Sequence, residues 1–100
     1  MTVVMQMRFR GITPEQYEEA RERVRWDVDY AEGGKLHIAA FDDEGLRVTD
    51  LWESAQHFER FGTERLMPAL NEMGITQQPE VEILPLHALL VVDVEQPAQA

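Results

Sequence analysis

The stretch KLHIAAFDDEGLRVTDLWES, residues 35–54, decides the fold of this chain. It contains two runs rich in Leu, Ile, Val, Phe and Trp, at 35–43 and 46–53, and such runs are typical of β-strands. Between them lies DDEG, whose acidic residues and glycine favour a tight turn. The stretch therefore predicts an antiparallel hairpin, and Ser54 at its end is a good cap for a following helix.

The length of the turn decides which side chains share a face of this hairpin. If residues 44–45 form a two-residue loop, counting back along both strands places His37 opposite Trp52. Asp50 then lies one pair away on the same face, so the three side chains form a cluster. A one-residue change in loop length moves His37 opposite Leu51 and breaks that cluster.

Before the hairpin, residues 2–9 predict a first strand with Val3, Met5, Met7 and Phe9 on one face. A helix should follow, because Thr13 and Gln16 have the spacing of a capping box. Its apolar residues keep helical spacing to about residue 30, and EGG at 32–34 then ends it. Trp26 and Tyr30 fall off its main apolar stripe, and we expect them to pack on the next loop or to gate a pocket there.

After the hairpin, a second helix is expected from Ser54 to about residue 73, with an apolar stripe on one face. Gly62 is a place for this helix to break, and Pro68 a place for it to bend. A long final strand is predicted at 80–94. Pro85 within it favours an edge position or a bulge, because proline has no N–H to donate to a neighbouring strand.

The resulting order is βαββαβ, an α+β ferredoxin-like fold with a four-stranded antiparallel sheet and two helices on one face. We expect one domain at 1–95 and a disordered tail at 96–100. Apolar residues occur on both faces of the predicted strands, so a single copy would expose an apolar sheet. The sequence therefore predicts a homodimer in which two sheets close face to face.

Composition narrows the function. The 100 residues carry a formal net charge of −10 and include no cysteine. A surface with this much negative charge repels phosphate groups, so nucleic acid and anionic membranes are disfavoured as partners. No apolar run approaches the roughly 18 residues of a membrane span, and the N-terminal sequence lacks the features of a signal peptide, so the expected location is the cytoplasm.

The same residues resemble a known superfamily over roughly 3–90. A His on the second strand, D-x-W-E-S leading into the second helix, a Phe-rich helix with a Pro, and a last strand with Pro and His are similar to uncharacterised bacterial members of the dimeric α/β-barrel superfamily. In this sequence the pattern comprises His37, Asp50 to Ser54, Phe58, Phe61, Pro68, Pro85 and His87. The resemblance is to the branch near the antibiotic biosynthesis monooxygenases. It implies a dimeric barrel with a small-molecule pocket and no bound cofactor.

Better-characterised branches of this superfamily typically have an Asn on the first strand and a Trp on the second helix, and haem degraders add a His along that helix. The first strand here offers Gln6, and the helix has Phe61 near the Trp position and Asn71 but no His further along. Haem degradation is therefore not expected, and monooxygenase activity is implied by fold alone.

The candidate catalytic pair is His37 and Asp50, since a carboxylate beside an imidazole orients the ring and favours its proton-accepting role. A buried structural pair is the equally weighted alternative, because a buried Asp needs a partner whatever its use. The expected ligand-binding residues are Trp52, Phe61, Met5, Met7 and His87. Core packing, or a structural hydrogen bond for His87, is the alternative for them.

Two further interpretations of the polar residues are less favoured. Ser54 and His57 could form a nucleophilic pair, but a helix cap accounts for both. The three His have no metal-ligand spacing, so no metal site is expected.

The leading function is a pocket protein, monooxygenase-like and cofactor-independent, acting on a hydrophobic or aromatic metabolite. The alternative is a non-catalytic dimer that binds a ligand or a partner protein. An open cavity beside His37 and Asp50 would favour the first of these, and a fully packed interface between sheet and helices the second.

Overall fold

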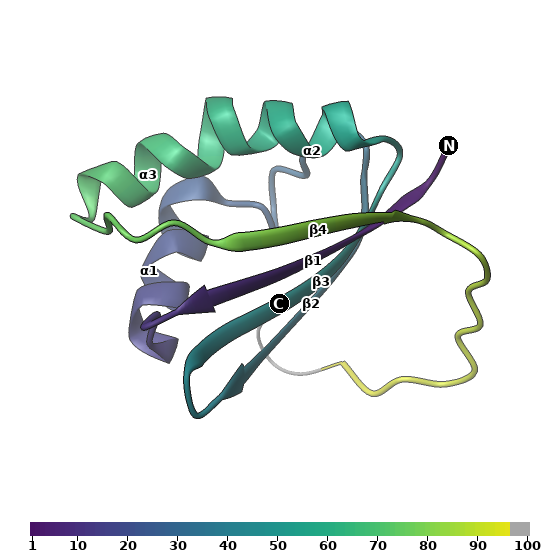
Figure 1. Cartoon of the computed structure of the whole chain (residues 1–100), viewed down its shortest axis with the longest axis horizontal. Helices are drawn as coiled ribbons and strands as arrows, with labels where there is room; N and C mark the ends of the chain where they lie inside the picture. Colours follow the sequence, from purple (N-terminus) through teal and green to yellow (C-terminus); the bar gives the residue numbers. More distant parts are fainter. Residues whose placement is uncertain (97–100) are drawn as a thin grey trace.

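The structure of the chain is a computed structural model and describes residues 1–96. Its sheet and helices follow the βαββαβ order (Figure 1). The elements are β1 (Val3–Arg10), α1 (Pro14–Val24), β2 (Gly34–Asp42), β3 (Gly45–Trp52), α2 (Ala55–Phe61), η1 (Gly62–Leu66), α3 (Met67–Glu72) and β4 (Glu80–Pro85).

The four strands form one antiparallel sheet in the order β2-β3-β1-β4. All the helices lie on one side of it (Figure 1). The helix-facing side chains of β1 are buried and those between them are more exposed, which is the alternation of a half-covered strand. The predicted ferredoxin-like α+β fold is confirmed.

The two-residue loop of the hairpin lies one residue earlier in the sequence than predicted. The loop is Asp43-Glu44, and Asp42 pairs with Gly45. The Asp42 carboxylate accepts hydrogen bonds from the backbone N–H groups of Glu44 at 2.8 Å and Gly45 at 3.0 Å, which closes the turn earlier than predicted. His37 consequently lies opposite Asp50 and not opposite Trp52. The pairing has moved by two residues in all, so each side chain keeps its face.

Helix α1 ends at Val24, about six residues earlier than predicted. Arg25 adopts a left-handed conformation with φ 65°, and its N–H bonds to the Arg21 carbonyl oxygen at 2.7 Å. This arrangement ends a helix in the usual way. Residues 25–33 therefore form the connection between α1 and β2, and this connection contains Trp26.

The second helical region is continuous from Ala55 to Glu72, with the π-helical turn η1 in its middle. Pro68 is the second residue of α3, which follows this turn. A proline in a helix lacks the N–H of a normal helical bond and its ring crowds the carbonyl four residues earlier, so a locally wider turn accommodates it. The predicted irregularity around Gly62 and Pro68 is present as this π turn.

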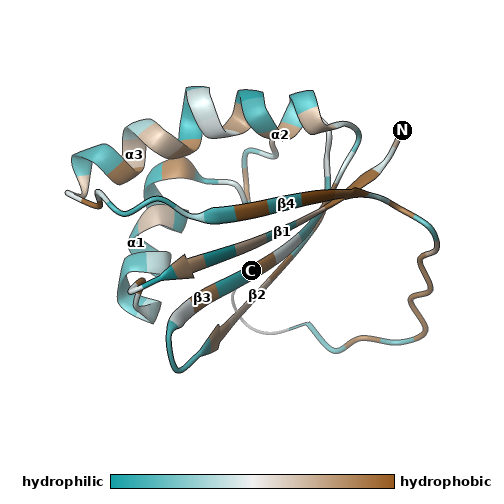
Figure 2. Cartoon of the chain, in the orientation of Figure 1, coloured by the Kyte–Doolittle hydropathy of each residue, from teal (hydrophilic) through white to brown (hydrophobic). Residues whose placement is uncertain are grey.

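Strand β4 ends at Pro85, although the pattern predicted a strand to residue 94. Its partner β1 begins at Val3, which pairs with Pro85, and a last backbone bond joins Leu86 N–H to the Thr2 carbonyl at 3.1 Å. Beyond that point the segment 86–96 has no strand beside it, and it contains many apolar residues (Figure 2). Leu89, Leu90, Val91, Val92 and Val94 are between 57% and 84% exposed. Of the expected tail at 96–100, residues 97–100 lie outside the described part of the chain.

No helix in residues 1–96 is long and apolar enough to cross a membrane.

Candidate functional site

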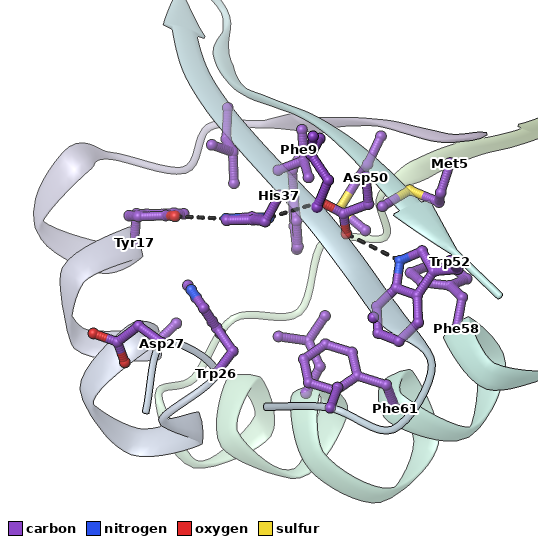
Figure 3. A pocket seen from close by; sticks show the side chains of 18 of the residues that line it. Met5, Phe9, Tyr17, Trp26, Asp27, His37, Asp50, Trp52, Phe58 and Phe61 are labelled. Carbon is purple, nitrogen blue, oxygen red and sulfur yellow. Dashed lines mark hydrogen bonds and ion pairs between the residues drawn. The ribbon is translucent and has the colours of Figure 1, made fainter. Parts of the chain in front are cut away.

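A cavity of about 500 Å³ lies between the helices and the helix-facing side of the sheet. This volume falls in the range of about 300–1,000 Å³ that is typical of small-molecule sites. Its wall is mostly apolar and includes Met5 and Met7 from β1. Figure 3 shows Met5 together with Trp52 from β3 and with Phe58 and Phe61 from α2. The space between sheet and helices is therefore open and not fully packed.

One polar chain of side chains crosses this apolar wall. The Tyr17 hydroxyl group lies 2.7 Å from His37 Nε2, and His37 Nδ1 lies 2.7 Å from Asp50 Oδ1. The other oxygen of Asp50 accepts a hydrogen bond from Trp52 Nε1 at 3.1 Å. Figure 3 shows these four side chains following one another from α1 across β2 to β3. Each side chain in this series is hydrogen-bonded to the next, and both oxygens of the buried Asp50 carboxylate have a hydrogen-bond partner.

These contacts fix the resting arrangement of protons. A carboxylate oxygen can only accept, so His37 Nδ1 carries the proton that is donated to Asp50. In a neutral ring, Nε2 then holds the lone pair and accepts from the Tyr17 hydroxyl. The His37 side chain remains 29% exposed, so solvent reaches its imidazole ring.

Burial raises the pKa of Tyr17 to about 12, and the nearby carboxylates of Glu18 and Asp50 act in the same direction. Desolvation has this effect because a phenolate loses more hydration than a phenol. Tyr17 is therefore a neutral hydroxyl donor at physiological pH, which matches its contact with the His37 lone pair.

Aromatic rings surround both ends of this polar chain. Trp26 packs 5.4 Å from Tyr17 and 5.6 Å from His37, measured between ring centroids. At the other end, Phe61 lies 5.4 Å from Trp52. Such tilted aromatic pairs are favourable contacts, and they place aromatic surface at both ends of the polar chain.

Trp26 is held in place by a contact from the second helical region. The Arg65 guanidinium group donates to the backbone carbonyl oxygens of Val24 at 2.7 Å and Asp29 at 2.8 Å, and it also lies over the Phe61 ring. The connection 25–33 is thereby tied to η1 on both sides of Trp26. Because Arg65 belongs to the π turn, this turn supports the wall of the cavity indirectly, by fixing the connection that carries Trp26.

The structure brings most of the predicted site residues together. His37, Asp50, Trp52, Phe61, Met5 and Met7 all line the cavity. His87 does not line it; this residue is exposed on the segment after β4.

Sequence reasoning missed Tyr17, which lies among the helically spaced residues of the first predicted helix. The available signal was its hydroxyl group, because a buried Tyr usually places that group against a polar partner.

Ser54 and His57 lie outside the cavity and make a helix cap. The backbone N–H of His57 donates to Ser54 Oγ at 3.2 Å, and Ser54 Oγ lies 2.7 Å from His57 Nδ1. The His57 ring also packs against Gly33, where an added Cβ would come within 2.5 Å of the ring. These contacts favour the cap over a nucleophilic pair. Among residues 1–96, no group of three or more His, Cys, Asp or Glu side chains is placed to hold a metal ion.

No protein-family model and no curated protein matches this sequence. Solved structures do match. SnoaB, a cofactor-independent oxygenase from Streptomyces nogalater, is 15% identical with a TM-score of 0.57, over 89% of this chain and 94% of SnoaB. A monooxygenase from the ActVA-Orf6 gene of Streptomyces coelicolor, solved with nanaomycin D, is 14% identical with a TM-score of 0.57, over 92% of each chain.

A proposed antibiotic biosynthesis monooxygenase from Caulobacter crescentus is 20% identical with a TM-score of 0.55, over 87% of this chain and 90% of the other. At such identities the likeness concerns the backbone and not the residues that perform chemistry. This chain has the ferredoxin-like fold of the antibiotic biosynthesis monooxygenase-like proteins.

Proposed function

We propose that this protein binds a hydrophobic or aromatic small molecule between its sheet and helices and removes a proton from it without a bound cofactor. The observation that carries the proposal is the His37–Asp50 pair, joined at 2.7 Å on the wall of a mostly apolar cavity of about 500 Å³. A pair that served only to stabilise the core would not need so large an open space beside it. The cofactor-independent oxygenase SnoaB, which has the same fold, supports this class of chemistry.

In the proposed reaction His37 is the final proton acceptor. Its ring becomes an imidazolium ion whose charge is balanced by the adjacent Asp50 carboxylate, and this makes acceptance of the proton easier. The ligand is left as an anion against the aromatic rings of Trp52 and Phe61, where little water competes. A conjugated anion of this kind can then react with molecular oxygen or rearrange.

The experiment is oxygen consumption with a panel of hydroxylated aromatic compounds, using wild-type protein and the variant His37→Ala. We expect wild type to accelerate oxygen uptake with at least one compound and His37→Ala to lose about 10²–10⁴-fold, the usual contribution of a general base. Glu64→Gln, at an exposed position on the helical layer, is the matched control. Unchanged turnover in His37→Ala would show that the mechanism is wrong.

The non-catalytic alternative predicts binding without turnover. It would hold if the panel compounds bind in the cavity, as shown by quenching of Trp fluorescence, but oxygen uptake matches the buffer for every compound. The two outcomes differ in the same set of samples, so one experiment separates them.

The exposed segment 86–94 supports a homodimer as the working form. Leu90 and Val92 are each 84% exposed, and Ile38 and Leu84 on the sheet are about half exposed. Apolar surface of this extent is unusual on a soluble monomer. Light scattering after size-exclusion chromatography should give about twice the chain mass of 11.6 kDa. Leu90→Asp should shift that mass towards one chain, and Thr63→Asp, an equally added charge on an exposed helical position, should not.

A further inference from the structure

His37 does not offer a free nitrogen to a ligand, because both of its ring nitrogens are engaged. Nδ1 donates to Asp50, and Nε2 accepts from Tyr17. The Tyr17 hydroxyl group uses its only proton as the donor in this hydrogen bond, and its oxygen still has a lone pair that can accept a bond from a second partner. Tyr17 lines the cavity, so this lone pair is available to a ligand inside it.

The charges around the cavity favour a ligand that arrives neutral. Within residues 1–96, the ionised side chains of its wall are Asp27, Lys35 and Asp50. Asp27 is paired with Arg21 at 2.7 Å, and Asp50 is used by the polar chain. Because Arg21 already balances Asp27, the remaining charges of the wall are one carboxylate and one exposed lysine, so the site suits an uncharged molecule.

A neutral hydroxyl group matches the lone pair on Tyr17. It can donate to the Tyr17 oxygen while the Tyr17 proton is donated onward to His37. Burial raises the pKa of Tyr17 to about 12, which makes a free phenolate an unfavourable intermediate. A relay avoids this intermediate, because one O–H bond of Tyr17 forms as the other breaks.

The geometry points to Tyr17 as the residue that contacts the ligand and passes its proton to His37, and to a neutral phenol or enol on an apolar body as the ligand. This inference rests on the proposed function and adds the contacting residue and the ligand class. In the transfer, the O–H bond of the ligand breaks and its proton joins the Tyr17 oxygen. The original Tyr17 proton joins His37 Nε2, and the ligand oxygen keeps the electron pair. The products are a ligand oxyanion and an imidazolium ion, so charge is conserved.

Trp26 provides a second observation at the same place. Its indole N–H is buried and makes no hydrogen bond of normal geometry with the residues that the structure describes, but it lies close enough to the Tyr17 hydroxyl group to act against the rise in the pKa of Tyr17. Figure 3 shows this nitrogen directed towards the bridge between Tyr17 and His37. A donor held there without a partner can stabilise negative charge that develops on the Tyr17 oxygen during the transfer. Trp26 is therefore a positioning residue for the relay.

The test compares 4-nitrophenol with 4-nitroanisole, a methyl ether of nearly the same shape that has no proton to donate. Binding is measured by calorimetry, and ionisation of bound 4-nitrophenol by its visible nitrophenolate band at a pH slightly below the pKa of the free probe. Wild type should bind the phenol about tenfold more tightly than the ether, the size of one good hydrogen bond, and should increase the ionised fraction. Tyr17→Phe, which removes a single oxygen, should lose both effects.

Two further variants separate the steps of the relay. His37→Gln should keep the preference for the phenol, because Tyr17 still accepts from it, and should lose the nitrophenolate band. Trp26→Phe should keep the preference and reduce the band. Melting temperatures close to that of wild type identify variants that keep the fold.

The outcomes that contradict the relay differ from those that contradict the pocket. If Tyr17→Phe keeps both the preference and the band, the ligand meets His37 directly and the relay is wrong. If wild type binds phenol and ether equally, the relay is wrong while the pocket stands. If neither probe binds, the proposed pocket function fails, and the relay fails with it.

Discussion

Replacement of Asp50 by Asn tests the proton arrangement of the polar chain with a change of one atom. The carboxylate accepts from two donors, His37 Nδ1–H at 2.7 Å and Trp52 Nε1–H at 3.1 Å. An amide has one acceptor and one donor, so it cannot serve both. If its oxygen faces His37, its NH₂ group faces the buried N–H of Trp52. If its oxygen faces Trp52, His37 must move its proton from Nδ1 to Nε2.

The arrangement in which the oxygen of the new amide faces Trp52 costs less free energy, because it leaves no pair of donors facing each other in the core. Trp52 is only 4% exposed, so water cannot replace a lost acceptor there. We therefore expect Asp50→Asn to switch the His37 tautomer. Nitrogen NMR of the imidazole ring reads this directly, since protonated and unprotonated ring nitrogens have well-separated chemical shifts. The switch also reverses the bond to Tyr17, which must then accept from Nε2–H.

The expected loss of stability in Asp50→Asn follows from the two hydrogen bonds to the carboxylate. A hydrogen bond to a charged group contributes roughly 1.5–3 kcal/mol to stability, and the variant replaces two such bonds by neutral ones. We expect a loss of about 2 kcal/mol in the free energy of unfolding, which in a domain of this size lowers Tm by roughly 8–16 °C. Calorimetry measures the shift. The control Glu64→Gln makes the same chemical change at an exposed position and should stay within about 0.5 kcal/mol. An unchanged tautomer together with a Tm shift no larger than that of the control would refute the reasoning.

Three shorter predictions concern other parts of the structure. Burial raises the pKa of Tyr17 from 10.0 to about 12, so its contribution to stability is present below pH 10 and is lost as the pH rises through 12; urea unfolding at stepped pH should show wild type losing roughly 2–3 kcal/mol more than Tyr17→Phe over that window. Ser54→Ala removes the cap of α2 and should cost about 1 kcal/mol in chemical denaturation, with little effect on ligand binding. Arg65→Met removes the donors to Val24 and Asp29 but keeps the aliphatic length, and amide hydrogen exchange in residues 25–33 should become faster. Unchanged exchange in those amides would show that the connection does not depend on Arg65.

The order and type of the elements could be predicted because local patterns determine them. Apolar alternation, the capping box at Thr13 and the acidic turn each involve residues close in sequence, and each is present in the structure. The ends of elements were harder. Helix α1 stops at Arg25 through a left-handed residue that is neither Gly nor Asn, and nothing in the local pattern marks this. Strand β4 stops where its partner strand stops, which is a property of the sheet and not of its own sequence.

The candidate site could be predicted in part for a similar reason. The loop was placed one position too late on both strands, yet His37 and Asp50 still share a face, because side chains in a strand repeat every two residues. Tyr17 could not be placed in the same way. Its contact with His37 joins a helix to a strand 20 residues further along, and it depends on how α1 packs across the sheet. The role of Trp26 depends on the same packing and on the early end of α1.

The polar chain is also where this structure departs most from the rules of a stable core. Asp50 is buried, and the Trp26 N–H has no acceptor within residues 1–96. A buried unsatisfied donor costs about 1–3 kcal/mol, and an open cavity beside Met5 and Trp52 forgoes packing that larger apolar side chains would provide. A sequence selected for stability alone would fill this space and remove these groups. A proton relay needs all three features together: a buried carboxylate that orients the imidazole, an N–H donor without an acceptor, and space for the molecule that donates the proton. These departures all occur at one cavity, and this argues for a site more strongly than any single residue does.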